Sequence, residues 1–116
     1  MANLEVMLRY APVKKVIAEL ADHGRILEIG GGSEGFSSFT DRKIFGVDMH
    51  FSRPLNSNIV PCVASAYRMP FPDNAFDAVI SMDMLEHIPA NHYNEVIAEI
   101  VRLSKRIVIL GFPSGT

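Results

Sequence analysis

The segment Arg25-Ile26-Leu27-Glu28-Ile29-Gly30-Gly31-Gly32-Ser33-Glu34-Gly35 decides the fold, because an apolar run ends there in a cluster of glycines. The run at 25–29 is short, which predicts a buried β-strand. Its glycines match the pattern G-x-G-x-x-G at positions 30, 32 and 35, where a chain turns sharply and a ligand can approach the backbone. The pattern alone fits a nucleotide-type site and a plain tight loop equally well.

Four further apolar runs predict strands, at residues 43–48, 59–64, 76–82 and 106–112. Their apolar residues are nearly continuous, as is typical of parallel strands that are buried on both faces. Pro61 cannot donate a hydrogen bond to a neighbouring strand, so we expect the run at 59–64 to lie at an edge of the sheet.

The chain before the first strand carries a helical pattern. Apolar residues at helical spacing predict a helix, namely Val13, Val16, Ile17 and Leu20. Pro12 suits its first turn, and Gly24 suits its end because glycine tolerates a left-handed cap. The shorter pattern at 4–8 fits either a separate leading helix or a frayed arm.

Two more helices are expected between the strands, a short one at 35–40 and a longer one at 90–104, whereas 51–58 is predicted to be a loop. Strands that alternate with helices predict an α/β fold. We therefore expect a single domain over residues 1–116, with an open, mainly parallel twisted sheet of about five strands and flanking helices.

Length and composition narrow the classes of function. The chain has 116 residues, enough for one domain, and 48% of them are hydrophobic, enough for a core. With 11 basic and 13 acidic side chains the net charge is −2, without a block of like charge. We therefore expect no nucleic-acid partner and no membrane partner. A single cysteine, Cys62, excludes an internal disulfide and a zinc site made of several thiolates, and we expect no metal.

The N-terminal residues 1–10 lack the basic head and apolar run of a signal peptide. The longest apolar run, at 107–112, is too short to cross a bilayer. These features lead us to expect a soluble, cytoplasmic protein.

Two acidic residues favour a nucleotide-type site over a plain loop. Glu28 interrupts an apolar strand, where a carboxylate without a partner would be costly to bury; the alternative is a strand-end charge that reaches solvent. Asp48 ends the second predicted strand, 20 positions after Glu28. An acidic residue in this place can accept hydrogen bonds from the hydroxyls of a ribose, whereas the alternative is an ordinary turn aspartate.

Longer motifs are more specific. The run Pro-Phe-Pro-Asp-x-x-Phe-Asp at 70–77 is followed by Leu-Glu-His-Ile-Pro at 85–89. Together with the acidic residue and glycine loop at 25–32 and the strand end at 46–48, these motifs resemble the class I S-adenosylmethionine-dependent methyltransferases, specifically the type 11 group. The resemblance extends from residue 25 to about residue 113.

This resemblance implies S-adenosylmethionine as the cofactor and methyl transfer to a small-molecule acceptor as the activity. The cofactor-binding residues that it implies are Glu28, Gly30, Gly31, Gly32, Asp48, Met49, Ser65, Ala66, Met82 and Asp83. The glycine backbone would pass beneath the methionine part of the cofactor, whose amino group Glu28 would help to hold. Asp48 would bind the ribose hydroxyls and Met49 would pack on the adenine.

The remaining implied residues complete the two ends of the cofactor. Ser65 and Ala66 would face the edge of the adenine, whereas Met82 and Asp83 would border the sulfonium and the acceptor. All of these positions follow the carboxyl ends of predicted strands, where open α/β sheets bind ligands.

Several positions depart from the family pattern. Glu34 replaces a glycine and would repel the cofactor's carboxylate, so we expect it to point away. Ser65 stands where the family often has an aspartate, and 103–106 replaces a Lys-Pro-Gly-Gly turn. The family core has two more strands after the fifth, whereas this sequence stops at Thr116. We therefore expect a Rossmann-like methyltransferase core without the last two strands, in a chain that is either a truncated piece or a minimal variant. The apolar run 107–110 is therefore expected at a bare sheet edge, covered by a second copy in a homodimer or by the leading helix.

Methyl transfer from a sulfonium is an in-line displacement that needs no protein nucleophile and no metal, because alignment and exclusion of water suffice. We assign no catalytic residue. His87 is the one histidine considered as a base, because it follows the fourth predicted strand on the cleft side, and a packing or capping role in its turn is the alternative. Two other functions are open: a non-catalytic methyltransferase-like module that acts through a partner, and a fragment of a nicotinamide-dependent dehydrogenase.

Overall fold

The computed structural model describes residues 4–20, 23–33, 35–82 and 84–111. Its elements, with η for 3-10 helices, are α1 (Leu4–Leu20), β1 (Ile26–Ile29), η1 (Phe36–Phe39), β2 (Ile44–Asp48), β3 (Ile59–Val63), β4 (Phe76–Ser81), η2 (Leu85–His87), η3 (Ala90–His92), α2 (Tyr93–Leu103) and β5 (Ser104–Leu110). The predicted strands and the short helix after the glycine loop are confirmed, with shifts of one or two residues at their ends.

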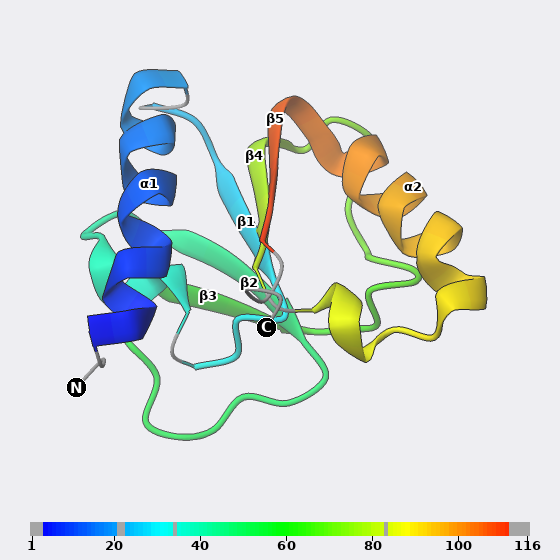
Figure 1. Cartoon of the computed structure of the whole chain (residues 1–116), viewed down its shortest axis with the longest axis horizontal. Coiled ribbons are helices and arrows are strands. Elements are labelled where there is room, and N and C mark those ends of the chain that lie inside the picture. Colours follow the sequence, from blue (N-terminus) through cyan, green and yellow to red (C-terminus); the bar gives the residue numbers. More distant parts are fainter. Residues whose placement is uncertain (1–3, 21–22, 34, 83, 112–116) are drawn as a thin grey trace.

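The five strands form one parallel sheet in the order β3-β2-β1-β4-β5 (Figure 1). In its centre Leu27 of β1 aligns with Phe45 of β2 and Val79 of β4. Strand β3 lies at one edge, as Pro61 predicted, and β5 lies at the other. The open parallel α/β sheet expected from the sequence is therefore confirmed.

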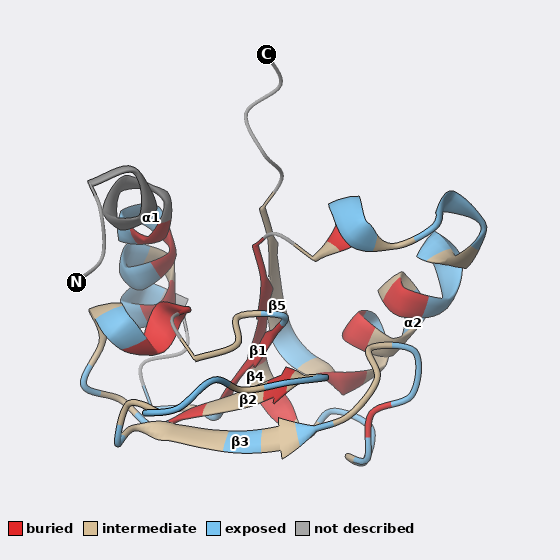
Figure 2. Ribbon diagram, turned by 90° about the horizontal axis from the view of Figure 1, so that it is seen from below, coloured by how far each residue is buried: buried red, intermediate tan, exposed pale blue. Residues whose placement is uncertain are grey.

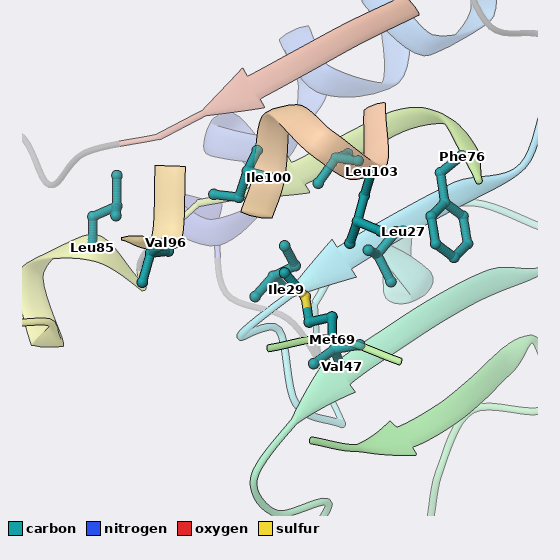
Figure 3. Packing of buried hydrophobic residues seen from close by; sticks show 10 residues of the cluster. Leu27, Ile29, Val47, Met69, Phe76, Leu85, Val96, Ile100 and Leu103 are labelled. Atoms are coloured by element: carbon teal, nitrogen blue, oxygen red, sulfur yellow. The ribbon is translucent and has the colours of Figure 1, made fainter. Parts of the chain in front are cut away.

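Helices α1 and α2 cover opposite faces of the sheet (Figure 2). On one face, Val13 and Ile17 of α1 join Ile26 of β1 in a buried cluster. On the other, Val96 and Ile100 of α2 belong to a second buried cluster. Its further members include Leu27, Ile29, Val47, Met69, Phe76, Leu85 and Leu103 (Figure 3). Successive residues of β1 thus enter different clusters, which explains why the strand is apolar throughout.

Helix α1 differs from its prediction, because it is one helix that continues through Pro12 instead of starting there. Proline inside a helix removes one backbone hydrogen bond. Here Tyr10 and Val13, on either side of the proline, are both buried in the same cluster. The packing of this continuous face compensates for the missing hydrogen bond.

Gly24 is not the left-handed helix cap that we expected, since the helix ends at Leu20 and Gly24 has no positive φ. A Cβ at Gly24 would collide with the side chain of Asp77. The Asp77 carboxylate accepts a hydrogen bond from the backbone N–H of Arg25 (2.9 Å). Gly24 is thus needed for close packing against the start of β4, not for its backbone conformation.

Strand β5 follows α2 without an intervening loop and begins at Ser104, two residues earlier than expected. Its faces are covered, because Ile107 and Ile109 pack on the α1 side and Val108 and Leu110 on the α2 side. In the part of the chain that the structure describes, its outer edge pairs with no strand. The leading helix therefore covers a face of β5 but adds no strand to its edge.

The Pro-Phe-Pro-Asp motif is held to α2 by a partly buried ion pair. Arg102 Nε donates to Glu99 Oε1 (2.6 Å) and Arg102 Nη2 to Glu99 Oε2 (3.0 Å). The same guanidinium donates to the carbonyl oxygens of Phe71 (2.7 Å) and Met69 (3.1 Å), and Glu99 accepts from the N–H of Met69 (2.8 Å). Asp73 adds a contact of 3.1 Å to Arg102. This clamp fixes the connection between β3 and β4.

The clamp predicts a pH-dependent stability. The hydrogen bond from Arg102 lowers the pKa of Glu99 below its ordinary value. The pair therefore stabilises the fold above the pKa of an unfolded glutamate, about 4.3, and this contribution is lost as the pH falls through the lower folded-state pKa. We expect Glu99→Gln to reduce the free energy of unfolding at pH 7 by about 1–2 kcal/mol, and by much less at pH 3. Urea unfolding at both pH values measures the difference.

Glu95→Gln is the matched control, because Glu95 lies on the same helix as Glu99. Within the described residues, its exposed carboxylate forms an ion pair only with His92. We expect this change to cost less than about 0.5 kcal/mol at pH 7. Equal losses in the two variants would contradict the clamp.

Candidate functional site

The order of the strands reverses direction at β1, and this reversal point lies at the carboxyl edge of the sheet. The chain runs outward from β1 through β2 to β3, and then returns to the other side of β1 to form β4. Such a reversal separates the segments that follow the two central strands, and open α/β sheets bind ligands at this point. Here the segments that follow β1 and β4 are the glycine loop and the chain from Met82 to η2.

The glycine loop has the backbone conformation that its sequence predicted. Gly30 and Gly32 have φ values of +80° and +56°, which side chains other than glycine rarely adopt. The N–H of Gly30 donates to the carbonyl of Val47 (2.8 Å), so the loop leaves the sheet only after this residue. A Cβ on Gly30 would lie 3.0 Å from the Cβ of Met84, which closes one side of the loop.

Glu28 lies beneath this loop and is only 4% exposed. Its Oε2 accepts a hydrogen bond from the hydroxyl of Tyr10 (2.7 Å), and its Oε1 accepts one from the backbone N–H of Phe36 (2.8 Å). A Cβ on Gly31 would lie 2.5 Å from the carboxylate carbon, and a Cβ on Gly35 would also collide with the carboxylate. Glu28 is therefore shielded from solvent, and the backbone of the loop packs directly against its carboxylate.

Asp48 faces the same loop from β2. Its Oδ1 accepts a hydrogen bond from the N–H of Met49 (2.8 Å), and among the described residues a Cβ on Gly32 would meet only Asp48 Oδ2, at 3.5 Å. Beside it, Met49 is 68% exposed, as is Val63, the register partner of Asp48 on β3. A partly exposed carboxylate next to exposed apolar groups can bind the hydroxyls and the flat base of a nucleoside.

Ser65 and Ala66 follow β3 in a tight turn. The Ser65 hydroxyl oxygen accepts a hydrogen bond from the N–H of Tyr67 (3.1 Å), and Ser65 pairs with Arg68 in an isolated antiparallel bridge. Ala66 packs against the cluster on the α2 side. The serine therefore shapes its own turn, while a hydroxyl oxygen keeps a second lone pair for another donor.

Met82 follows β4 and is buried in the cluster on the α1 side. A Cβ on Gly111 would approach its thioether to 2.8 Å, so the chain after β5 crosses closely over it. The expected site residue Asp83 lies outside the described residues, as does Glu34, whose orientation we expected to be outward.

The histidines form no common centre. His87 is exposed on η2, with Nε2 3.6 Å from Glu86. His92 contacts Glu95 (2.9 Å) and lies edge-on to the ring of Tyr67 (5.2 Å between centroids). Within the described ranges there is no group of three or more residues able to hold a metal ion, and no helix with the length and apolar character of a membrane span.

Two contributions to the site were not predicted. Tyr10 was considered only as the end of the segment checked for a signal peptide, and its hydroxyl reaches Glu28 across 18 positions of sequence. The Ser33 hydroxyl donates to the carbonyl of Ser52 (2.5 Å) and ties the glycine loop to the segment after β2. Neither residue carries a sequence signal of its own, because both contacts depend on the packing of distant segments.

Known proteins resemble this chain in sequence and in fold. A family model described as a methyltransferase domain matches residues 27–110. No curated protein matches the chain significantly.

Among solved structures, the PH0226 protein of Pyrococcus horikoshii OT3 is 24% identical with a TM-score of 0.71, over 95% of this chain and 59% of that one. A SAM-dependent methyltransferase of Archaeoglobus fulgidus is 23% identical with a TM-score of 0.66, over 90% of this chain and 52% of that one.

A third structure is the 1,6-didemethyltoxoflavin-N1-methyltransferase of Burkholderia thailandensis, with bound 1,6-didemethyltoxoflavin and S-adenosylhomocysteine. It is 16% identical with a TM-score of 0.63, over 87% of this chain and 51% of that one. At these identities the likeness concerns the fold. The chain spans between about half and three-fifths of the length of these three structures.

The contact between Glu28 and the loop predicts that replacing Gly31 destabilises the fold. We expect Gly31→Ala to lower the free energy of unfolding by about 1–3 kcal/mol, because the new methyl group would overlap the buried carboxylate. Gly46→Ala is the control, since a Cβ there would make only ordinary contacts, at 3.5 Å or more. Chemical denaturation of both variants tests this, and a Gly31→Ala protein as stable as Gly46→Ala would contradict it.

Proposed function

The chain belongs to the methyltransferase domain family, and on this premise we propose that it binds S-adenosylmethionine at the carboxyl edge of its sheet and transfers the methyl group to a small-molecule acceptor. The observation that carries the proposal is the position of Asp48, whose carboxylate faces Gly32 beside the exposed side chain of Met49. The neighbouring structure with bound S-adenosylhomocysteine supports the class of cofactor.

The residues at this edge fit the cofactor. The backbone of Gly30, Gly31 and Gly32 would receive its methionine part, since Asp48 is the one described residue that a Cβ on Gly32 would approach. Asp48 would accept hydrogen bonds from the ribose hydroxyls, and Met49 would cover the adenine. Glu28 packs beneath the loop and fixes its position. Through the loop, it would help to hold the amino group of the cofactor.

The other expected residues would complete the site. Ser65 and Ala66 would border the adenine edge from the turn after β3, and Met82 and Asp83 would border the sulfonium and the acceptor from the end of β4. Carboxylates near this edge would also favour a ligand that carries a positive charge.

The chemistry requires little from the protein beyond positioning. S-adenosylmethionine supplies an electrophilic methyl group on a good leaving group. The protein would align the acceptor with that group and exclude water, and alignment of this kind lowers a barrier substantially. The packing of the glycine loop on the buried Glu28 suits this task, because the loop cannot move toward Glu28 without displacing its carboxylate.

A second candidate is a module that binds the cofactor without transferring its methyl group and acts through a partner. The observation that favours it is the altered glycine loop, in which Glu34 stands where the family commonly has a glycine. The nicotinamide-dependent dehydrogenase is not retained, because the family match is to methyltransferases.

Calorimetric titration with S-adenosylhomocysteine tests the cofactor site. We expect Asp48→Ala to weaken binding by about 10- to 100-fold, because the ribose hydroxyls lose a charged acceptor. Asp41→Ala is the matched control, since Asp41 is exposed near the opposite end of the same strand, and should bind as the unmodified protein does. Binding of NAD instead, or equal binding by both variants, would refute the proposal.

Incubation with radiolabelled S-adenosylmethionine and a metabolite extract then separates the two candidates. Transfer of label to a small molecule, lost in Asp48→Ala, supports the enzyme. Cofactor binding without transfer supports the module.

We also propose that the free edge of β5 pairs with β5 of a second copy. The run Ile107 to Leu110 has four apolar residues and lacks the charges and prolines that protect exposed edges. We expect light scattering to show a dimer whose fraction rises with protein concentration. A monomer that persists at high concentration would contradict this pairing.

A further inference from the structure

Helix α1 reaches the candidate site through Tyr10. This side chain is 6% exposed, and its ring stacks on Phe39 (5.2 Å between centroids, 22° between planes) and lies 6.0 Å from the ring of Phe36. Its hydroxyl donates the 2.7 Å hydrogen bond to Glu28 Oε2. The ring thus fixes the helix against η1, and the hydroxyl connects it to the buried carboxylate.

The Glu28 carboxylate transmits this contact to the glycine loop. On one side its Oε1 accepts from the N–H of Phe36, at the start of η1. On the other it occupies the space in which Cβ atoms on Gly31 and Gly35 would lie. A shift of the carboxylate must therefore move the loop, the first turn of η1, or both.

A hydrogen bond to a buried charge is worth more than one between neutral groups, because the charge has little water to replace it. If the Tyr10 hydroxyl were absent, the carboxylate would lose one donor, and its position would then depend more on its remaining contacts, which include the N–H of Phe36. The resting position of Glu28 thus depends on a residue of α1 that does not itself belong to the loop.

We propose that Tyr10 is a positioning residue for cofactor binding, which couples the docking of α1 to the shape of the glycine loop through Glu28. Because coupling between sites is reciprocal, cofactor binding also strengthens the docking of α1. This inference rests on the proposed function, in that the loop is the part of the site that receives the cofactor.

Tyr10→Phe tests the coupling, because it keeps the ring and removes only the hydroxyl. We expect affinity for S-adenosylhomocysteine, measured by calorimetry, to fall by about tenfold. In the protein without ligand, we expect faster hydrogen exchange of the Phe36 amide, measured by NMR, because this N–H donates to the displaced carboxylate. The second readout does not depend on ligand binding.

Ile17→Val is the control for a merely structural role of α1. Ile17 is buried in the same cluster, but its aliphatic side chain cannot donate a hydrogen bond to Glu28. We expect it to lower the melting temperature while leaving both the affinity and the exchange of Phe36 unchanged.

Unchanged affinity and unchanged Phe36 exchange in Tyr10→Phe would overturn the coupling, as would an equal loss of affinity in Ile17→Val. If the unmodified protein binds no S-adenosylhomocysteine, the proposed function fails, and the exchange of Phe36 in Tyr10→Phe still decides whether Tyr10 controls the loop.

Discussion

The burial of the Glu28 carboxylate is the constraint on which the site depends. A carboxylate in the central strand of a sheet is tolerated only where donors surround it, and the donors to Glu28 include the Tyr10 hydroxyl and the backbone N–H of Phe36. The carboxylate then fills the space below Gly31 and Gly35. One carboxylate thus explains the glycines at 31 and 35 and contributes a contact to the turn into η1 and to the attachment of α1.

The parallel topology supplies the rest of the site. Because β1 has β2 on one side and β4 on the other, the loops after these strands meet at one edge although they are far apart in sequence. At the other end of the molecule, Glu99 and Arg102 clamp the connection from β3 to β4. The Pro-Phe-Pro-Asp motif is therefore explained by the anchoring of this connection, and the site at the carboxyl edge is formed by other segments.

Where sequence interpretation and structure differ, packing between distant segments is the reason. Pro12 suggested a helix start, but the buried face of α1 continues through it. Gly24 suggested a helix cap, but the side chain of Asp77, 53 positions later, is what excludes a larger residue. The continuous apolar runs suggested strands buried on both faces, but Cys62 of β3 is only half-buried because this strand lies at the sheet edge.

The sequence by itself determined the strands, their parallel arrangement and the glycine loop with Asp48 at the end of the second strand, because apolar periodicity, glycine conformation and spacing are local properties. Only the tertiary structure decided that Glu28 points toward α1, that Tyr10 is one of its donors, and that Asp48 faces Gly32. These contacts join segments up to 18 positions apart, and such contacts are set by the way whole elements pack. Local sequence patterns do not specify which side chains come into contact when distant elements pack together.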